Sequence, residues 1–506
     1  MSEVAAPDPQ DVAAIASGYA LALTPAELEA ITSVVGAMCA AFDGIGRMAP
    51  LAHDLVPPTG RRESHVPAAG DNPLGAWYRR CAIRTHERGP LAGRTVAVKD
   101  SIAVGGVPLA NGSAFLEGYV PDFDATVVTR VLEAGGTIAG KAVCEPMCMS
   151  SFGNGAHTGP VRNPHDPAHA PGGSSSGCAA LVGARAVDMA IGGDNGGSIR
   201  IPSSWCGVYG LKPSWGLVPY TGAFAMVPQG DHLGPMASDM ADLELLLGVL
   251  AGPDGLDPRQ RAGLALGRPA FGGVHELRVG VLREGFAWPG KSEPDADAAV
   301  EQAIAGFAKL GARVAPVSIP LHRDGAAIMG VLGAEMGRGM FDDDAIGGPF
   351  LGWTSPSLTA HYHGAWRSGV QSLSLPSKVQ LIASRYLLGR GVQPQLALAR
   401  NLALVLQRAY DAALRDVDVL AMPTVTHKPK LLPRAPLAPA DELAIAWDQS
   451  RNTRPFNLTG HPALNVPCAE IDGLPIGLEL VGRRGEDATV VRAGRIFADR
   501  IFAPGG

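Results

Sequence analysis

Apolar and polar positions follow two different rhythms along most of this chain. Short apolar runs rich in β-branched residues occur at 94–104 (RTVAVKDSIAV), 277–285 (LRVGVLREG) and 416–424 (DVDVLAMPT). Longer amphipathic stretches lie between such runs, at 124–136 and at 294–311. Short continuous apolar runs are typical of buried strands, and amphipathic stretches of this length are typical of helices. The alternation predicts an α/β fold with a largely internal sheet.

Residues 1–80 have a helical pattern of their own. Thr24, Pro25 and Glu27 are arranged as a capping box with proline at the first helical position. Apolar residues then recur at spacings of three and four, in one stripe formed by Leu28, Ile31, Val35, Met38 and Phe42. Such a stripe indicates packing against the main domain, and a homodimer contact through the same stripe is the alternative.

The pattern divides the rest of the chain into three parts. Residues 81–320 carry the regular alternation of strands and helices, and residues 406–506 return to it. Between them, residues 321–405 are irregular, helical and aromatic, as in FLGWTSPSLTAHYHGAW at 350–366. We therefore expect an α/β core made by 81–320 and 406–506, with 321–405 as an inserted, cap-like region that forms one wall of a site.

Composition excludes several classes of function. The 42 basic and 48 acidic residues give a net charge of −6. The chain therefore has no excess of positive charge to attract nucleic acid or an anionic membrane. The first 14 residues lack a basic flank and an apolar core, so neither a signal peptide nor a membrane span is expected. Seven scattered cysteines indicate reduced thiols and a cytoplasmic location. Cys144 and Cys148 form a lone C-x₃-C, and no metal site is expected.

Two local motifs imitate known sites. The run 135–141 (GGTIAGK) matches a phosphate-binding loop, but Ala142 stands where a hydroxyl is needed for Mg²⁺, and the run precedes a strand where such a loop would open a helix. The run 173–177 (GSSSG) fits the nucleophile elbow of α/β-hydrolases with Ser175 as nucleophile. No strong strand precedes it, so this interpretation is the weaker one.

Three polar residues stand out in apolar or glycine-rich surroundings. Lys99 lies within an apolar run, where burial of an ammonium group is costly and favours the neutral amine. Ser174 lies in GGSSSG, and Ser198 lies in GGDNGGSIRIP at 192–202. A neutral lysine beside a hydroxyl is a competent general base, and a strand-end lysine that reaches solvent is the alternative.

The segments that carry these residues resemble the amidase signature family. The matching segments are VAVKDSI, APGGSSSGCAA, GGDNGGSIRIPSSWCGVYGLKPSWG and the C-terminal NLTGHPALNVP with GLPIGLEL, in the family's order and spacing. The resemblance runs from about residue 72 to the C-terminus. Within the family, NPLGAWY at 72–78 and LVPYTGAF at 217–224 are similar to the broad-spectrum amidases of bacterial nitrile-degradation pathways.

The resemblance implies a fold, a triad and a reaction. The fold is a mixed, twisted central sheet with helices on both faces. Ser198 would be the nucleophile, Ser174 (after a cis bond to Gly173) would relay protons, and Lys99 would be the base. The backbone N–H groups of Asn195, Gly196, Gly197 and Ser198 would form the oxyanion hole. The implied activity is hydrolysis of a carboxylic amide to an acid and ammonia or an amine, without metal or cofactor.

The resemblance says less about the substrate. Met149 aligns with an aromatic pocket residue of the nitrile-pathway amidases, and Met149, Ser175 and Asn195 are the expected substrate-binding residues; ordinary core filling is the alternative for Met149. Ser175 would also support the loop. Asp194 and Arg200 are interpreted as structural polar residues. The expected partner is a small amide, ester or carbamate. Alternatives on the same triad are hydrolysis of aryl amides, esters or carbamates, and a less favoured role as the transamidation component of a tRNA-dependent amidotransferase.

Overall fold

A computed structural model describes residues 4–48, 55, 58, 60–227, 229–261, 263–343 and 352–502. The chain divides into two compact units between residues 56 and 57. The first holds two helices, α1 (Pro9–Gly18) and α2 (Pro25–Met48). The predicted capping box is present, since the N–H of Thr24 donates to Glu27 at 2.8 Å and the N–H of Glu27 donates to Thr24 Oγ1 at 3.3 Å.

The apolar stripe of α2 is largely exposed, with Leu28 and Val35 partly buried. Ile31, Met38 and Phe42, which belong to the predicted stripe, and the neighbouring Val34 are all exposed. By length and composition, the segment Pro25–Phe42 within α2 could cross a membrane, and it is the one such helix among the described residues. One helix of this kind is a weak indication, because a signal sequence or a core helix of a soluble protein meets the same criterion.

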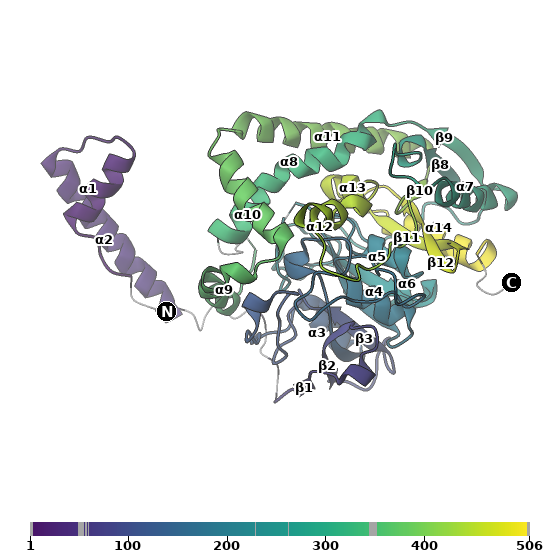
Figure 1. Ribbon diagram of the computed structural model, residues 1–506, viewed down its shortest axis with the longest axis horizontal. Helices are drawn as coiled ribbons and strands as arrows, with labels where there is room; N and C mark the ends of the chain where they lie inside the picture. Colours follow the sequence, from purple (N-terminus) through teal and green to yellow (C-terminus); the bar gives the residue numbers. More distant parts are fainter. Residues whose placement is uncertain are drawn as a thin grey trace. The chain divides into compact units, whose positions relative to one another are not determined.

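The second unit is built on one sheet of twelve strands (Figure 1). Their order across the sheet is β1-β2-β4-β3-β5-β7-β6-β11-β12-β10-β8-β9. The strands are β1 (Ser64–His65), β2 (Trp77–Ile83), β3 (Thr95–Lys99), β4 (Thr137–Ala142), β5 (Met189–Asp194), β6 (Tyr209–Lys212), β7 (His232–Ala237), β8 (Arg278–Leu282), β9 (Arg313–Val317), β10 (Val419–Pro423), β11 (Ala463–Ile471) and β12 (Leu474–Val481). Because β1 and β2 already belong to it, the sheet begins upstream of the boundary at residue 80 that the sequence pattern indicates.

The sheet is mixed, as expected. β3 runs parallel to both β4 and β5, and β8 runs parallel to both β10 and β9. The strands between these groups pair antiparallel, through β5–β7, β7–β6, β6–β11, β11–β12 and β12–β10. The apolar run at 277–285 and the amphipathic stretch at 294–311 are present as β8 and the helix α7 (Pro294–Lys309), and β9 follows this helix.

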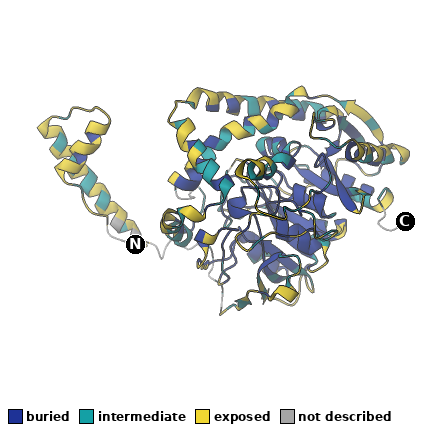
Figure 2. Cartoon of the chain, viewed as in Figure 1, coloured by how far each residue is buried: buried dark blue, intermediate teal, exposed yellow. Residues whose placement is uncertain are grey.

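Helices cover both faces of the sheet. They are α3 (Thr126–Glu133), α4 (Ser176–Gly183), α5 (Arg200–Trp205), α6 (Met240–Leu250), α7 (Pro294–Lys309), α8 (Gly325–Gly337), α9 (Pro356–Ser368), α10 (Leu375–Leu388), α11 (Gln393–Asp416), α12 (Pro439–Ala446), α13 (Arg454–Thr459) and α14 (Asp487–Arg500). In β3, Val96 and Val98 join the core that includes side chains of α3, α6, α7 and α14, whereas Ala97 joins the core of α4. Successive strand residues point to opposite faces, so these two cores lie on opposite sides of the sheet. In Figure 2 the central strands are mostly the dark blue of buried residues, whereas helices such as α11 carry yellow, exposed stretches.

Residues 321–405 form helices that lie beside the core. α8 packs against both α10 and α11. Aromatic side chains from this region, Phe341, Tyr362 and Trp366, share a buried cluster with Met149 and Phe224 of the core loops. The inserted region thus contacts the segment that carries Met149. Residues 344–351, within this region, lie outside the described residues.

Candidate active site

Two parallel strands end beside each other at the candidate site. β3 ends at Lys99 and β5 ends at Asp194, with Val98 opposite Ile191 in the register. The carboxyl ends of parallel strands meet at one edge of a sheet, where α/β proteins bind their ligands. Lys99 is fully buried, and its Nζ donates to the carbonyl oxygen of Gly193 at 3.0 Å.

The structure brings Lys99 and Ser174 together. Nζ of Lys99 and Oγ of Ser174 are 2.8 Å apart, although 75 positions separate them in sequence. The peptide bond between Gly173 and Ser174 is cis. The carbonyl oxygen of Ser174 accepts a hydrogen bond of 3.1 Å from the N–H of Glu145. Among the described residues, no carboxylate pairs with Lys99; its hydrogen bonds go to Ser174 and Gly193, and the thiol of Cys148 also interacts with it.

Ser198 lies in the loop between β5 and α5. Its carbonyl oxygen accepts a 3.1 Å hydrogen bond from the N–H of Ser175, which places the two serine-bearing segments side by side. The Ser174 residue is fully buried, whereas Ser198 retains 6% exposure. No described residue forms a hydrogen bond with the hydroxyl of Ser198. This hydroxyl is therefore the one of the pair that a substrate can reach.

The hydroxyl of Ser175 is occupied by the backbone of Gly193. Oγ of Ser175 donates to the carbonyl of Gly193 at 3.0 Å and accepts from its N–H at 3.2 Å. The side chain is fully buried. This geometry favours a positioning role for Ser175 over the predicted substrate-binding role, and it also speaks against Ser175 as the nucleophile of an elbow.

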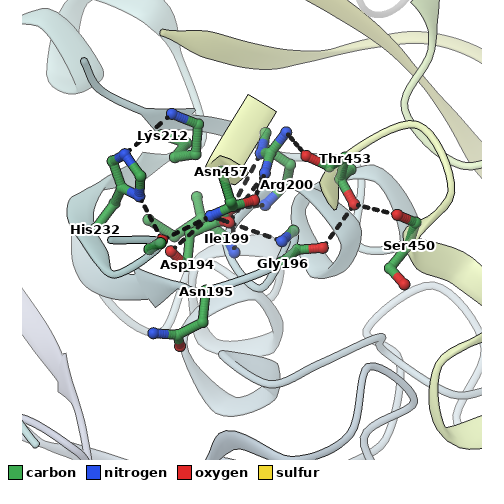
Figure 3. Close-up of polar contacts among 12 residues, drawn as sticks. Asp194, Asn195, Gly196, Ile199, Arg200, Lys212, His232, Ser450, Thr453 and Asn457 are labelled. Atoms are coloured by element: carbon green, nitrogen blue, oxygen red, sulfur yellow. Dashed lines mark hydrogen bonds and ion pairs between the residues drawn. The ribbon is translucent and has the colours of Figure 1, made fainter. Parts of the chain in front are cut away.

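Asp194 organises the glycine loop that follows it. Its carboxylate accepts hydrogen bonds from the N–H groups of Gly197 at 2.7 Å and Ile199 at 3.0 Å. The amide of Asn457 donates to the backbone carbonyl and the carboxylate of Asp194, each at 2.9 Å. Figure 3 shows these contacts converging on Asp194 from the loop and from the C-terminal part of the chain. The loop is thus held in one conformation by a residue at its own base.

Arg200 is buried, and every N–H of its guanidinium has a partner. Nε and Nη2 donate to the two oxygens of Asp194 at 3.0 and 2.9 Å, and Nη2 also donates to Asn457 at 2.6 Å. Nη1 donates to Glu479 at 2.6 Å and to the carbonyl of Thr453 at 3.0 Å. A guanidinium offers five N–H donors, and all five are used here. The structural interpretation of Asp194 and Arg200 agrees with this geometry.

Burial and charge act in opposite directions within this network. Burial raises the pKa of Asp194, but the charge and hydrogen bonds of Arg200 outweigh it and hold the pKa of Asp194 well below its usual range. Burial raises the pKa of Glu479 to about 7 despite Arg200. Burial, followed by the charge of Arg200, lowers the pKa of Lys212 to about 7. Asp194 and Arg200 therefore form the permanently charged pair of the network.

Replacing Arg200 with leucine is expected to destabilise the protein by about 3–5 kcal/mol, because the variant leaves the carboxylate of Asp194 buried without its counter-charge. Urea unfolding followed by circular dichroism measures the loss. The control is Arg84→Leu, which removes an exposed arginine paired with Glu87 at 3.4 Å and should cost about 0.5 kcal/mol or less. A loss below about 1 kcal/mol for Arg200→Leu would contradict this account.

Gly197 is the loop position where glycine is required. Its φ is +121°, which side chains rarely allow, and a Cβ there would lie 2.2 Å from Oγ1 of Thr453. That hydroxyl is fixed, since it donates to the carbonyl oxygen of Gly196 at 2.8 Å. The close approach explains why the chain places glycine in a buried region directly before Ser198.

The side chain of Asn195 points away from the Asp194–Arg200 network (Figure 3). Its Nδ2 donates a short hydrogen bond to Oδ1 of Asp231. Asp231 is itself fixed by the N–H groups of Met226 at 2.8 Å and Val227 at 3.0 Å. Oδ1 of Asn195 is buried and has no hydrogen-bond partner among the described residues. The amide therefore presents an acceptor whose orientation Asp231 fixes.

Met149 lines a small cavity. The cavity has a volume of about 140 Å³, and its walls include Glu145, Met149, Ser150, Ala446 and Pro376. Glu145 is buried, and burial raises its pKa to about 7 against the hydrogen bonds that favour its charged form. The residues that line the cavity come from the segment 145–155, which precedes Ser174 in the chain, from the inserted region and from α12. Glu145 was not among the residues predicted from sequence, because nothing in its local pattern marks it.

Lys141 of the run 135–141 and the two cysteines of the C-x₃-C pair make contacts within the fold. Lys141 lies within β4, and its Nζ is 3.0 Å from the buried carboxylate of Asp100. The thiols of Cys144 and Cys148 both donate to Oδ1 of Asn111, at 3.5 and 3.6 Å. Within the part of the chain that the structure describes, no group of three or more His, Cys, Asp or Glu side chains is placed to hold a metal.

The mixed sheet and the buried contact between Lys99 and Ser174 at its edge agree with the amidase signature family that the sequence resembles. The chain matches the family model described as "Amidase" over residues 76–491, and it belongs to that family.

Proteins of similar sequence and structure indicate the class of reaction. An enantioselective amidase from Rhodococcus rhodochrous is 40% identical over 504 residues, covering 97% of this chain and 95% of the relative. A glutamyl-tRNA(Gln) amidotransferase component from Methanosarcina mazei is 35% identical, over 81% of this chain and 85% of that relative. The crystal structure of the corresponding component from Thermotoga maritima superposes with a TM-score of 0.67 at 27% identity, over 84% of this chain and 88% of that one. These similarities support hydrolysis of an amide C–N bond, with the amidotransferase role less supported.

Proposed function

We propose that this protein hydrolyses carboxylic amides through an acyl-enzyme on Ser198. The observation that carries the proposal is the 2.8 Å contact between Lys99 and Ser174 at the strand edge, next to the loop that bears Ser198. Serine is a weak nucleophile on its own and needs a base to accept its proton. Lys99 and Ser174 supply a base and a relay in a buried setting.

Each step can be written with its protons in place. With Lys99 neutral, Ser174 gives its proton to Nζ of Lys99 and accepts the proton of Ser198, whose oxygen attacks the amide carbonyl. The proton then returns through Ser174 to the amine, which leaves as the C–N bond breaks. Water attacks the resulting ester by the same relay and releases the carboxylic acid. The cycle ends with all three residues as they began.

The loop before Ser198 supplies the stabilisation of the oxyanion in this proposal. The N–H groups of Asn195, Gly196, Gly197 and Ser198 are its candidate donors, and the N–H of Gly197 is already engaged by Asp194 at 2.7 Å. In this proposal the N–H of Gly197 therefore holds the loop, and the other three N–H groups are the candidate donors. A single donor of this kind contributes about 3 kcal/mol to the stabilisation of the transition state.

Covalent labelling of Ser198 tests the proposal. The chain is treated with a fluorophosphonate, digested and analysed by mass spectrometry, and the adduct is expected on Ser198. An adduct on Ser175 would favour the α/β-hydrolase mechanism instead. Turnover of a panel with an alkyl amide, an aryl amide, an ester and a carbamate of related acyl groups then decides between amide hydrolysis and the alternatives on the same triad. Activity of the purified chain alone would exclude dependence on amidotransferase partners.

Asn195 is proposed to accept a hydrogen bond from an N–H of the substrate. Replacing Asn195 with leucine should lower kcat/KM for a primary amide by about 10- to 100-fold, because a buried donor of the substrate loses its acceptor. The oxygen ester of the same acid has no such N–H and should change about threefold or less, which makes the ester the control. An equal loss for both substrates would place Asn195 in the support of the loop.

Two further expectations accompany this proposal. The first is a homodimer formed through the exposed stripe of α2, which sedimentation velocity of the full chain measures. The second is a cytoplasmic location, with which the seven free cysteines are in keeping. The expected partner is a small-molecule substrate, with neither nucleic acid nor membrane involved.

A further inference from the structure

Arg454 lies against the loop that precedes Ser198. It begins α13 and directly follows Thr453, the residue that holds the carbonyl of Gly196. Cγ, Cδ and Nε of Arg454 lie 3.3, 4.0 and 3.6 Å from the position that a Cβ on Gly196 would take. The stem of the arginine therefore covers Gly196, two positions before the candidate nucleophile.

The guanidinium of Arg454 has no partner among the described residues, neither a hydrogen-bond acceptor nor a carboxylate. Asp448, six positions before Arg454 in the sequence, is shared by Arg451 at 2.5 Å, Lys291 at 2.7 Å and Lys430 at 3.3 Å. Three cations thus already occupy this one acid. Burial, followed by the charge of Arg451, lowers the pKa of Arg454 to about 10, and the side chain remains charged at neutral pH.

Arg454 differs from Arg200 in the use of its N–H donors, and this difference indicates a role in binding. An arginine that stabilises the fold forms hydrogen bonds through its N–H donors, as Arg200 does through all five. The guanidinium of Arg454 is half-buried, the described residues leave its donors unused, and these donors are therefore available to an arriving anion. The planar fork of N–H groups matches a carboxylate in two parallel hydrogen bonds.

We propose that Arg454 is a specificity-determining residue that binds a carboxylate on the acyl part of the substrate. The preferred substrates are then monoamides of dicarboxylic acids, in which one end carries the scissile amide and the other a negative charge. This inference rests on the proposed function, because it assumes that the acyl group is attached at Ser198. It adds a substrate class that the Lys99–Ser174–Ser198 chemistry does not specify.

Matched pairs of substrates test the inference. The monoamides of succinic, glutaric and adipic acid are each compared with the corresponding neutral diamide. At low salt, the wild type should prefer the anionic member of at least one pair by about tenfold or more in kcat/KM, and the preference should shrink as salt is raised. Arg454→Met should abolish the preference through KM and leave the diamide within about threefold, whereas Arg454→Lys should retain part of it. The control Arg84→Met removes an exposed charge and should keep the preference.

A binding measurement makes the result independent of turnover. In Ser198→Ala, isothermal titration should show tighter binding of the same monoamide than of its diamide, and the added Arg454→Met change should remove the difference. Equal affinity of Ser198→Ala for both members of every pair would overturn the inference, as would an equal loss for both substrates in Arg454→Met. Failure of the wild type to hydrolyse any amide would instead contradict the proposed function.

Discussion

Replacing Ser198 with alanine is expected to lower kcat/KM for an amide by about 10⁴- to 10⁶-fold, because the variant has no oxygen to form the acyl-enzyme. The protein should fold normally, since the hydroxyl makes no hydrogen bond with any described residue. Steady-state kinetics on a primary amide and a thermal unfolding curve measure the two effects. The combination of a large kinetic loss and an unchanged melting temperature distinguishes a nucleophile from a structural serine.

Ser175 provides the matched control, three consecutive serines being present at 174–176. Ser175→Ala removes both hydrogen bonds to Gly193, so it should affect stability and cost activity only through the position of the loop. We expect a loss of about 10- to 100-fold in kcat, far below that of Ser198→Ala. Near-normal turnover by Ser198→Ala, or complete inactivity of Ser175→Ala in a folded protein, would reverse the two assignments.

The local sequence pattern was sufficient to predict several strands and helices of the fold. The strands β3, β8 and β10 lie within the apolar runs that predict them, and α7 begins at Pro294 as the sequence indicates. The capping box before α2 also forms. These features depend on residues a few positions apart, so their physical causes are visible in a short window. The order of the twelve strands depends on pairings between distant segments and was not predicted, since the resemblance to a family implied only a mixed sheet with helices on both faces.

The contacts that hold the site in place could not be predicted from the sequence alone. Arg200 meets Glu479 across 279 positions and Asn457 across 257 positions, and no periodicity links them. Glu145 and Arg454 were missed for the same reason, because their importance comes from burial and from neighbours that only the fold provides. The glycines at 196 and 197 were marked by their motif, but the reason for Gly197, the hydroxyl of Thr453, lies 250 or more positions downstream in the chain.

Lys99 and Lys141 are two buried lysines on neighbouring parallel strands, and their replacements should have opposite effects. Lys99→Met is expected to lower kcat/KM for an amide by about 10³-fold or more, because Ser174 loses the group that accepts and returns its proton. Stability should change by about 1–2 kcal/mol at most, since no carboxylate pairs with Lys99 and the variant removes only its hydrogen bonds to Ser174 and Gly193. Kinetics and urea unfolding of the same preparation measure both quantities.

The control is Lys141→Met, which leaves the carboxylate of Asp100 buried without its partner at 3.0 Å. We expect it to cost about 3–5 kcal/mol of stability. An activated aryl ester separates the roles further. Its leaving group needs no proton, so Lys99→Met should retain more of its esterase than of its amidase activity. If Lys99→Met lost both activities equally together with its stability, Lys99 would be a structural residue, and the proton relay through Ser174 would have to begin elsewhere.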